Sequence, residues 1–360
     1  MTPRENLLRC LNRQGGFDTV PFSFELCPAM VEKFKAATGC PHGDYGSFFD
    51  FPLRGGIVYR SSNQDRDWRP RYPRPLHPKA AFSEFGVAHE PSESREAFHL
   101  TRMLHPMESF DSLEQFQSWP WPVIEPARFE GSREGVARTQ SRGYAAAAWM
   151  ACTIWETCWY LRGMEPLMMD MMAGDDKAVF LLDTVTELSA RRAECVAAAG
   201  IDLLRLGDDI GMQHGMMMAP EFWLDWLQPR LKKVIARARA AAPGPLLVLY
   251  HSCGFVEPAI PGLLDAGVDI LDPVQPECMD FAKLHALYGD RLSFHGAIGT
   301  QTTMPFGTPA EVDAAVNRNL DIAGKKGGFV PAPTHLVEPE VPWENMDAFI
   351  RACRNYRYGR

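Results

Sequence analysis

The chain has 360 residues, of which 46% are hydrophobic and 23% are charged. This balance is typical of a globular enzyme with a large core, and it excludes a fibre or a disordered chain. The formal net charge of −8 argues against nucleic-acid binding, because neutralising phosphates needs a surplus of Lys and Arg. We therefore expect the partner to be a small-molecule substrate.

Cysteine usage and the amino terminus predict the compartment. The nine cysteines are an odd number spread over a long chain, without the density of a disulfide scaffold, so we expect reduced thiols. Arg4, Glu5, Arg9 and Arg13 interrupt the apolar run that a signal peptide needs. No run of about eighteen apolar residues follows. These features predict a cytoplasmic protein with no membrane contact.

The first 140 residues are less regular than the rest. Leu7, Leu8 and Leu11 have helical spacing, and residues 19–27 then become strand-like. Residues 54–79 are rich in Arg and Pro and predict a loop, which could bind an anion but is more typical of a solvated surface. Residues 81–107 suggest a hairpin, closed by the Trp-Pro-Trp-Pro run at 119–122. We expect an irregular hairpin and loop excursion here.

From residue 143 to 346 the chain alternates between apolar strand-like runs and helical patterns. The runs are 145–154, 202–206, 245–250, 268–271, 292–294 and 328–330. Continuous apolar runs are typical of parallel strands buried on both faces. With a strand near Phe22 and one more in the early segment, eight strands are expected. The sequence thus predicts an α/β fold, a (β/α)8 TIM-type barrel, with residues 1–360 as one domain.

Polar residues follow nearly every predicted strand. Since the active site of such a barrel lies at the carboxyl ends of its strands, these residues are the candidates for chemistry. They are Glu156, Asp208, Asp209, His251, Cys253, Asp272, Gln275, His295, Thr334 and His335.

The pair His251 and Cys253 gives the sharpest prediction. Side chains at i and i+2 of an extended segment point the same way, so an imidazole and a thiolate could face one zinc ion. The candidates for the remaining ligands are His335, Cys278, Glu156 and Asp208. The alternative is a small buried thiol beside an ordinary hydrogen-bonded histidine.

Asp208 and Asp209 are adjacent, so only one of them can point into the mouth of the barrel while the other caps a loop or helix. A carboxylate in the mouth could orient a substrate, bind a metal or stabilise a developing cation. Turn formation is the competing interpretation, and it is stronger for Asp209 than for Asp208.

Several segments together carry a resemblance to a known family. They are Tyr250 to Gly254, Gly267 to Pro276, Gly296 to Gln301, Gly327 to His335 and Val341 to Asn345, with Glu156, Arg162 to Glu165 and Leu206 to Gly211. The chain resembles the uroporphyrinogen decarboxylase superfamily, and within it the corrinoid-linked methyltransferase branch. The likeness covers most of the chain beyond residue 140 and is looser before it. It implies a (β/α)8 barrel, and a homodimer is plausible.

The methyltransferase branch implies zinc bound by a motif that begins His-x-Cys, as His251 and Cys253 do. Zinc there binds a thiol, whose thiolate attacks the methyl group of a methylcorrinoid. The branch's third ligand is a cysteine near the last strand, where this chain has Thr334 beside His335. We predict zinc, and a corrinoid cofactor that a partner protein could carry. The predicted metal ligands are His251, Cys253 and His335 (or Cys278), the catalytic residues Asp208, His335 and Glu156, and the substrate-binding residues Asp209, Gln275, His295 and Glu25.

The decarboxylases of the superfamily imply a different chemistry. They carry an arginine just after the first strand that holds the substrate's carboxylates, whereas residues 22–28 here contain Glu25 and no arginine. Glu25 would repel such a substrate. The second hypothesis is nevertheless a metal-free decarboxylase or lyase for a tetrapyrrole or aromatic acid, with Asp208 and His335 as acid and base. A ligand-binding protein without turnover is a third hypothesis.

Overall fold

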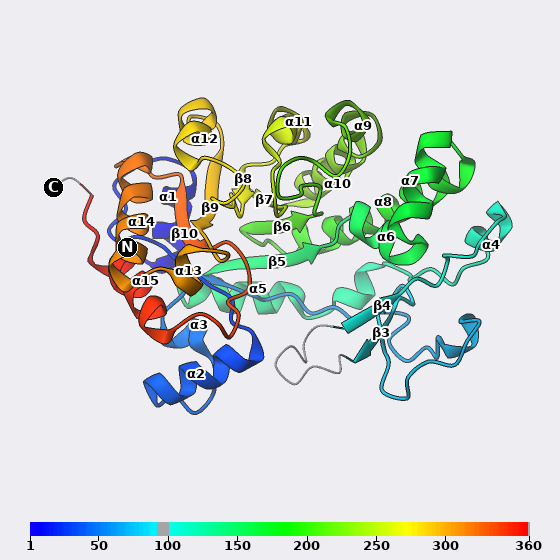
Figure 1. The fold of residues 1–360 in the computed structure, drawn as a ribbon, viewed down its shortest axis with the longest axis horizontal. Helices are drawn as coiled ribbons and strands as arrows, with labels where there is room; N and C mark the ends of the chain where they lie inside the picture. Colours follow the sequence, from blue (N-terminus) through cyan, green and yellow to red (C-terminus); the bar gives the residue numbers. More distant parts are fainter. Residues whose placement is uncertain (92–100, 359–360) are drawn as a thin grey trace.

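The computed structural model describes residues 1–91 and 101–358 (Figure 1). Its helices are α1 (Pro3–Leu11), α2 (Pro28–Thr38), α3 (Tyr45–Phe48), α4 (Leu113–Gln117), α5 (Ser132–Ser141), α6 (Trp155–Arg162), α7 (Met164–Ala173), α8 (Asp176–Ala197), α9 (Pro220–Trp226), α10 (Gln228–Ala241), α11 (Ile260–Ala266), α12 (Phe281–Tyr288), α13 (Thr303–Phe306), α14 (Pro309–Ala323) and α15 (Trp343–Asn355). Its strands are β1 (Leu53–Arg54), β2 (Ala81–Phe82), β3 (Ala88–Pro91), β4 (Thr101–Leu104), β5 (Ala145–Ala151), β6 (Leu203–Gly207), β7 (Leu247–His251), β8 (Ile270–Asp272), β9 (Ser293–Ile298) and β10 (Phe329–Pro333).

A seven-stranded parallel sheet forms the centre of the molecule. Its order is β1-β5-β6-β7-β8-β9-β10, so each strand pairs with the next one of the sheet along the chain. The chain returns between most strands through helices, and these helices wrap the sheet (Figure 1). The six later strands predicted from apolar runs are confirmed. Because all strands are parallel, their carboxyl ends lie at one edge of the sheet.

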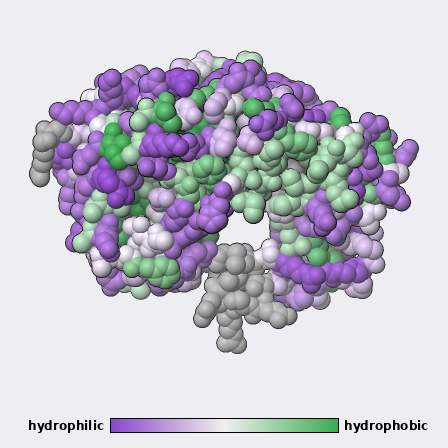
Figure 2. Space-filling view, turned by 45° about the horizontal axis from the view of Figure 1, so that its top comes forward, coloured by the Kyte–Doolittle hydropathy of each residue, from purple (hydrophilic) through white to green (hydrophobic). Residues whose placement is uncertain are grey.

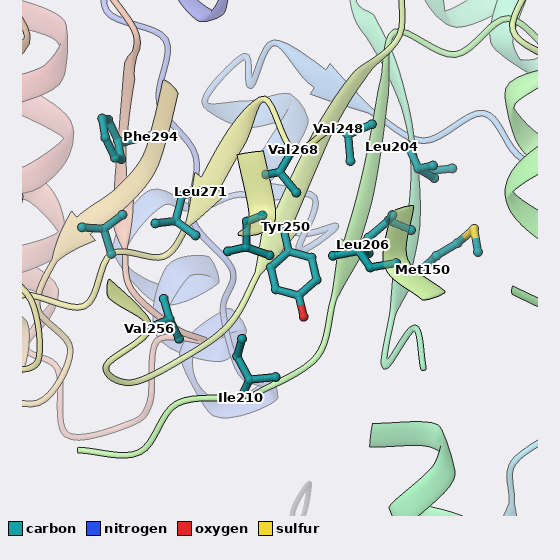
Figure 3. Packing of buried hydrophobic residues seen from close by; sticks show 14 of the residues in the cluster. Met150, Leu204, Leu206, Ile210, Val248, Tyr250, Val256, Val268, Leu271 and Phe294 are labelled. Atoms are coloured by element: carbon teal, nitrogen blue, oxygen red, sulfur yellow. The ribbon is translucent and has the colours of Figure 1, made fainter. Parts of the chain in front are cut away.

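Strand residues alternate between two apolar environments. Leu204, Leu206, Val248 and Tyr250 point toward the surrounding helices and form part of the main core (Figure 3). The residues between them face the inside of the curled sheet, where they form a smaller cluster with α1. That inner cluster contains Leu7, Cys10, Leu11, Phe17, Ala145, Ala147, Leu203, Leu249, Ile270 and Val330.

The strand predicted near Phe22 does not form in the part of the chain that is described, and this corrects the expected count of eight strands. Residues 20–27 are extended but pair with their neighbour only through a bridge between Leu26 and Val337. Pro21 lacks an amide hydrogen, and Phe22 and Phe24 instead pack on Phe51 at ring centroid distances of 5.7 and 4.8 Å. Residues 20–27 therefore lie between Phe51, just before β1, and Val337, just after β10.

The excursion between β1 and β5 has its own small sheet. Strands β2, β3 and β4 are antiparallel, and the predicted hairpin corresponds to β3 and β4. Residues 92–100 of the predicted hairpin lie outside the described residues. The Arg- and Pro-rich segment contains one turn of 3-10 helix, Arg69–Arg71, and Trp68 stacks on Trp119 beneath it.

Hydrophilic residues dominate the outer surface, whereas hydrophobic residues gather on one wall of the notch that indents the molecule (Figure 2). Throughout residues 1–91 and 101–358, each helix is too short or too polar to cross a membrane.

Candidate metal and substrate site

The residues that follow strands β6 and β7 meet at the carboxyl end of the sheet. His251 ends β7 and is paired in register with Gly207, which ends β6. Cys253 and Asp209 each stand two residues beyond these strand ends. The Cys253 Sγ lies 3.6 Å from Nε2 of His251, so the two side chains face one point as the i, i+2 spacing predicts.

Asp209 joins this pair. Its Oδ1 lies 3.9 Å from Nε2 of His251, and the ligand atoms of Asp209, His251 and Cys253 all lie within 4.8 Å of one another. The same oxygen accepts a hydrogen bond of 2.8 Å from the backbone N–H of Cys253, which ties the two loops together. A carboxylate, an imidazole and a thiolate are ligands that zinc accepts, and three protein ligands leave a position open for a reacting group.

The turn after Cys253 depends on a glycine. Gly254 has φ +80°, and a Cβ at this position would lie 2.7 Å from the backbone carbon of Gly211. Its N–H donates a hydrogen bond of 3.1 Å to Oε1 of Gln275, which is buried. Only glycine combines this backbone conformation with such a close approach. Gln275 therefore holds the turn that presents Cys253.

Asp272, the last residue of β8, orients two histidines at once. One carboxylate oxygen pairs with Nδ1 of His251 and the other with Nδ1 of His295. Burial would raise the pKa of Asp272, but the His295 and His251 imidazoles outweigh burial and hold the pKa well below its usual range. The ionised carboxylate accepts from Nδ1–H of His251 and leaves Nε2 facing Cys253 and Asp209. Such a carboxylate partner is the usual support of a metal-binding histidine.

Arg205 and Ser23 extend this hydrogen-bonded group into the sheet interior. Arg205 projects inward from β6, donates to Oε1 of Glu25 at 2.6 Å and lies 3.4 Å from Oδ2 of Asp272. On the far side of His295, Nε2 lies 2.9 Å from the Ser23 hydroxyl. Glu25 and His295, both predicted to bind substrate, therefore meet in one network through Asp272 and Arg205.

Asp208 and Glu156 support the loop that carries Asp209. The Asp208 carboxylate is buried and accepts from the backbone N–H groups of Ile154 and Glu156, so it caps the start of α6. Glu156 accepts from the backbone N–H of Asp209 at 3.1 Å and from the Tyr160 hydroxyl at 2.7 Å. Burial, and then the charge of Asp209, raise the pKa of Glu156. Both carboxylates thus hold backbone in place.

His335 and Cys278 lie outside the group formed by Asp209, His251 and Cys253 in the described part of the chain. His335 is exposed and lines a cavity of about 360 Å³, together with Asp209 and Cys253. Cys278 is partly exposed. Thr334 is buried, and its hydroxyl lies 3.1 Å from that of Thr300.

A larger cavity of about 690 Å³ occupies the inside of the curled sheet. His251, Asp272, His295 and Arg205 line one end of it. Apolar side chains of α1 and the inner strand face line the remainder, including Leu7, Leu11, Leu203, Leu249, Ile270 and Val330. Its volume lies in the range of small-molecule sites, about 300–1,000 Å³.

Sequence reasoning missed several residues of this region. Asp209, predicted to bind substrate, lies in one group with His251 and Cys253, and Asp272 was noted at a strand end without a role. Trp149 and Arg205 were hidden inside apolar runs, although each occupies an inward position of its strand. A polar or large aromatic residue on the inner side of a strand is a signal that could have identified both.

The fold and the site define a class: a parallel α/β protein with hydrogen-bonded His, Asp and Cys side chains at the carboxyl end of its sheet. A family model described as uroporphyrinogen decarboxylase (URO-D) matches residues 120–356. The chain belongs to this family, and the resemblance seen in the sequence is confirmed.

A solved methyltransferase structure shares the fold. A methyltransferase from Methanosarcina mazei is similar over 98% of both chains, with a TM-score of 0.67 and 17% sequence identity. A candidate vitamin-B12-independent methionine synthase from Listeria monocytogenes aligns over 58% of this chain and 62% of its own, at 17% identity and a TM-score of 0.37, too low to support an argument. No curated protein matches the chain.

Proposed function

We propose that the chain is a methyltransferase-like enzyme that transfers a methyl group to or from a corrinoid, with zinc bound by Asp209, His251 and Cys253. The observation that carries the proposal is the convergence of these three ligand atoms within 4.8 Å, between one cavity that His251 lines and another that Asp209 and Cys253 line. Membership of the family and the shared fold of a methyltransferase support it. The extended residues 20–27 would take the place of the eighth barrel strand.

The residues present fit a zinc ion. Asp209 and the Cys253 thiolate would balance its two positive charges, and the carboxylate of Asp272 already fixes the orientation of His251. When bound, zinc supplies Lewis-acid activation of a substrate thiol or oxygen. Asp209 is the third ligand in this proposal, whereas the candidates from the sequence were His335, Cys278, Glu156 and Asp208.

The side chains of the protein bind and orient the substrate in this proposal. The apolar part of the cavity excludes water, and the Asp272 carboxylate keeps His251 and His295 in fixed orientations. Glu156 and Asp208 hold the Asp209 loop by accepting from its backbone and from the start of α6. A corrinoid is the proposed methyl carrier, on a partner protein or bound at the open mouth, and a homodimer remains the proposed assembly.

Metal analysis of the purified protein tests the proposal. We expect about one zinc per chain, lost in Asp209→Ala, His251→Ala and Cys253→Ala, since a three-ligand site without one ligand binds zinc weakly. Inductively coupled plasma mass spectrometry measures the content.

Cys278→Ala and His335→Ala are the matched controls, one for each of the other predicted third ligands. Both variants are expected to keep the zinc of the wild type. Zinc-free wild-type protein in every preparation would contradict the proposal, and zinc loss in His335→Ala but not in Asp209→Ala would transfer the third ligand to His335.

The second candidate function is a metal-free decarboxylase or lyase. The family itself and the Asp272–His295–Ser23 chain favour it, because this chain could move a proton without a metal. Carbon dioxide release from a tetrapyrrole or aromatic acid that persists in the presence of chelators would support this function over methyl transfer.

A further inference from the structure

We propose that the cavity inside the sheet takes an uncharged, flat and largely apolar molecule with a single polar end, and that Trp149 selects for it. The inference rests on the proposed function in one respect, since it names the substrate class of the same site.

Trp149 forms an unusual part of the lining. It follows Ala145 and Ala147 on the inner side of β5. Despite this inward position, its side chain is 47% exposed. Its exposed surface faces the cavity, beside Arg205, its register partner on β6. An indole that is left uncovered inside an apolar cavity offers a flat contact surface for a ring or another planar group.

Both guanidinium groups of the lining are already engaged by other groups of the protein. The charged side chains that line the cavity, apart from histidines, are Glu25, Asp44, Arg54, Arg205 and Asp272. Arg205 is held by two of these carboxylates, Glu25 and Asp272. Arg54 donates to the Gly46 carbonyl at 2.9 Å and lies over the Tyr144 ring at 4.6 Å.

Carboxylates therefore outnumber guanidinium groups at this site by three to two. A zinc ion would not change the balance, because Asp209 and the Cys253 thiolate neutralise it. A ligand carboxylate or sulfonate would lose its hydration without gaining an ionic partner, which is costly. The cavity consequently favours uncharged molecules.

The largest connected set of polar groups lies toward the carboxyl ends of the strands. His251, Asp272, His295 and Ser23 form a connected hydrogen-bonded set there, whereas Leu7 and Leu11 belong to the apolar cluster that lines the rest. A ligand with its heteroatom at one end would direct that atom toward His251 and His295 and bury its apolar part. The fit thus requires an amphiphilic but uncharged molecule.

Two fluorescent probes with the same ring system test the inference on the wild-type protein. N-phenyl-1-naphthylamine is uncharged, and 8-anilino-1-naphthalenesulfonate adds one sulfonate. Fluorescence titration is expected to give saturable binding of the uncharged probe and at least about tenfold weaker binding of the sulfonate. Equal affinities, or no binding of the uncharged probe, would overturn the inference.

Variants then locate the probe. Trp149→Ala is expected to weaken binding of N-phenyl-1-naphthylamine at least about tenfold, and Trp149→Phe, which keeps a ring, by a smaller factor. Phe306→Ala is the matched control, since Phe306 is 78% exposed on the surface and outside the cavity. Unchanged binding in folded Trp149→Ala, or an equal loss in Phe306→Ala, contradicts the assignment. If Trp149→Ala does not fold, the Trp149→Phe comparison and the wild-type probe ratio decide.

Zinc analysis separates this inference from the proposed function. A zinc-free protein that distinguishes the two probes as expected would remove the zinc mechanism and keep the ligand class. A zinc-containing protein that binds both probes equally would keep the zinc mechanism and remove the ligand class.

Discussion

At the scale of single residues, Asp272 determines how His251 can act. Its carboxylate is buried at the end of β8 and accepts from both His251 and His295, so neither imidazole is free to rotate. The sequence shows Asp272 only as one polar residue after an apolar run. Its role depends on the pairing of β7 with β8, which places His251 opposite Asp272.

We predict that Asp272→Asn lowers zinc affinity by about 10- to 100-fold, because the support of His251 is weakened while the three ligands remain. Competition with a chromophoric chelator measures the dissociation constant. Asp321→Asn, which changes a surface carboxylate bonded to the Tyr356 hydroxyl, is the control and should keep wild-type affinity. Unchanged affinity in folded Asp272→Asn would show that Asp272 does not position the ligand.

At the scale of elements, the start of α6 depends on a side chain from another strand. Asp208 follows β6 and accepts from two backbone N–H groups of the chain that enters α6, beside β5. The sequence predicted that one of the two adjacent aspartates faces the mouth and favoured Asp208 over Asp209. Asp209 has the more accessible carboxylate, because Asp208 turns toward the unpaired N–H groups of the helix.

Asp208→Ala is therefore expected to destabilise the fold by about 2–4 kcal/mol, from the lost cap and the buried N–H groups left unpaired. Calorimetry should show a lower Tm. Asp175→Ala, which removes the more exposed cap of α8, is the matched comparison and should cost about 1 kcal/mol. Should Asp208→Ala keep wild-type stability but lose activity, a catalytic role for Asp208 would replace the structural one.

Residues 20–27 also differ from the strand predicted for them. Alternating apolar residues there predict a strand, but Pro21 and the packing of Phe22 and Phe24 on Phe51 leave only one bridge to the neighbouring chain. The inward positions Ser23 and Glu25 are polar and are used by His295 and Arg205. Periodicity indicates that the segment is extended but does not determine whether it pairs.

At the scale of the whole molecule, the nine cysteines are all free thiols and differ in access. The buried ones are Cys10, Cys27, Cys158, Cys195 and Cys353. Burial raises the pKa of Cys10 to about 11 and that of the partly exposed Cys152 to about 12. Since the thiolate is the reactive form, both remain protonated and slow near pH 8.

Titration of the native protein with a disulfide reagent at pH 8 should therefore modify Cys40 and Cys278 first. Cys253 is expected to react only after a chelator removes zinc, and all nine thiols in denaturant, where burial no longer raises their pKa values. Peptide mapping identifies the modified residues. Rapid reaction of Cys253 in a zinc-loaded protein, or of Cys158 in the native state, would contradict this order.

The sequence by itself determined the α/β class, the later strands and the joint orientation of His251 and Cys253. These properties are local, since they follow from apolar runs and from the i, i+2 geometry of one extended segment. Only the tertiary structure decided that Asp209 completes the group, that Asp272 orients both histidines and that Arg205 is neutralised inside the cavity. Each of these depends on residues far apart in the chain that parallel pairing brings to one edge of the sheet, and spacing in a single sequence cannot specify such contacts.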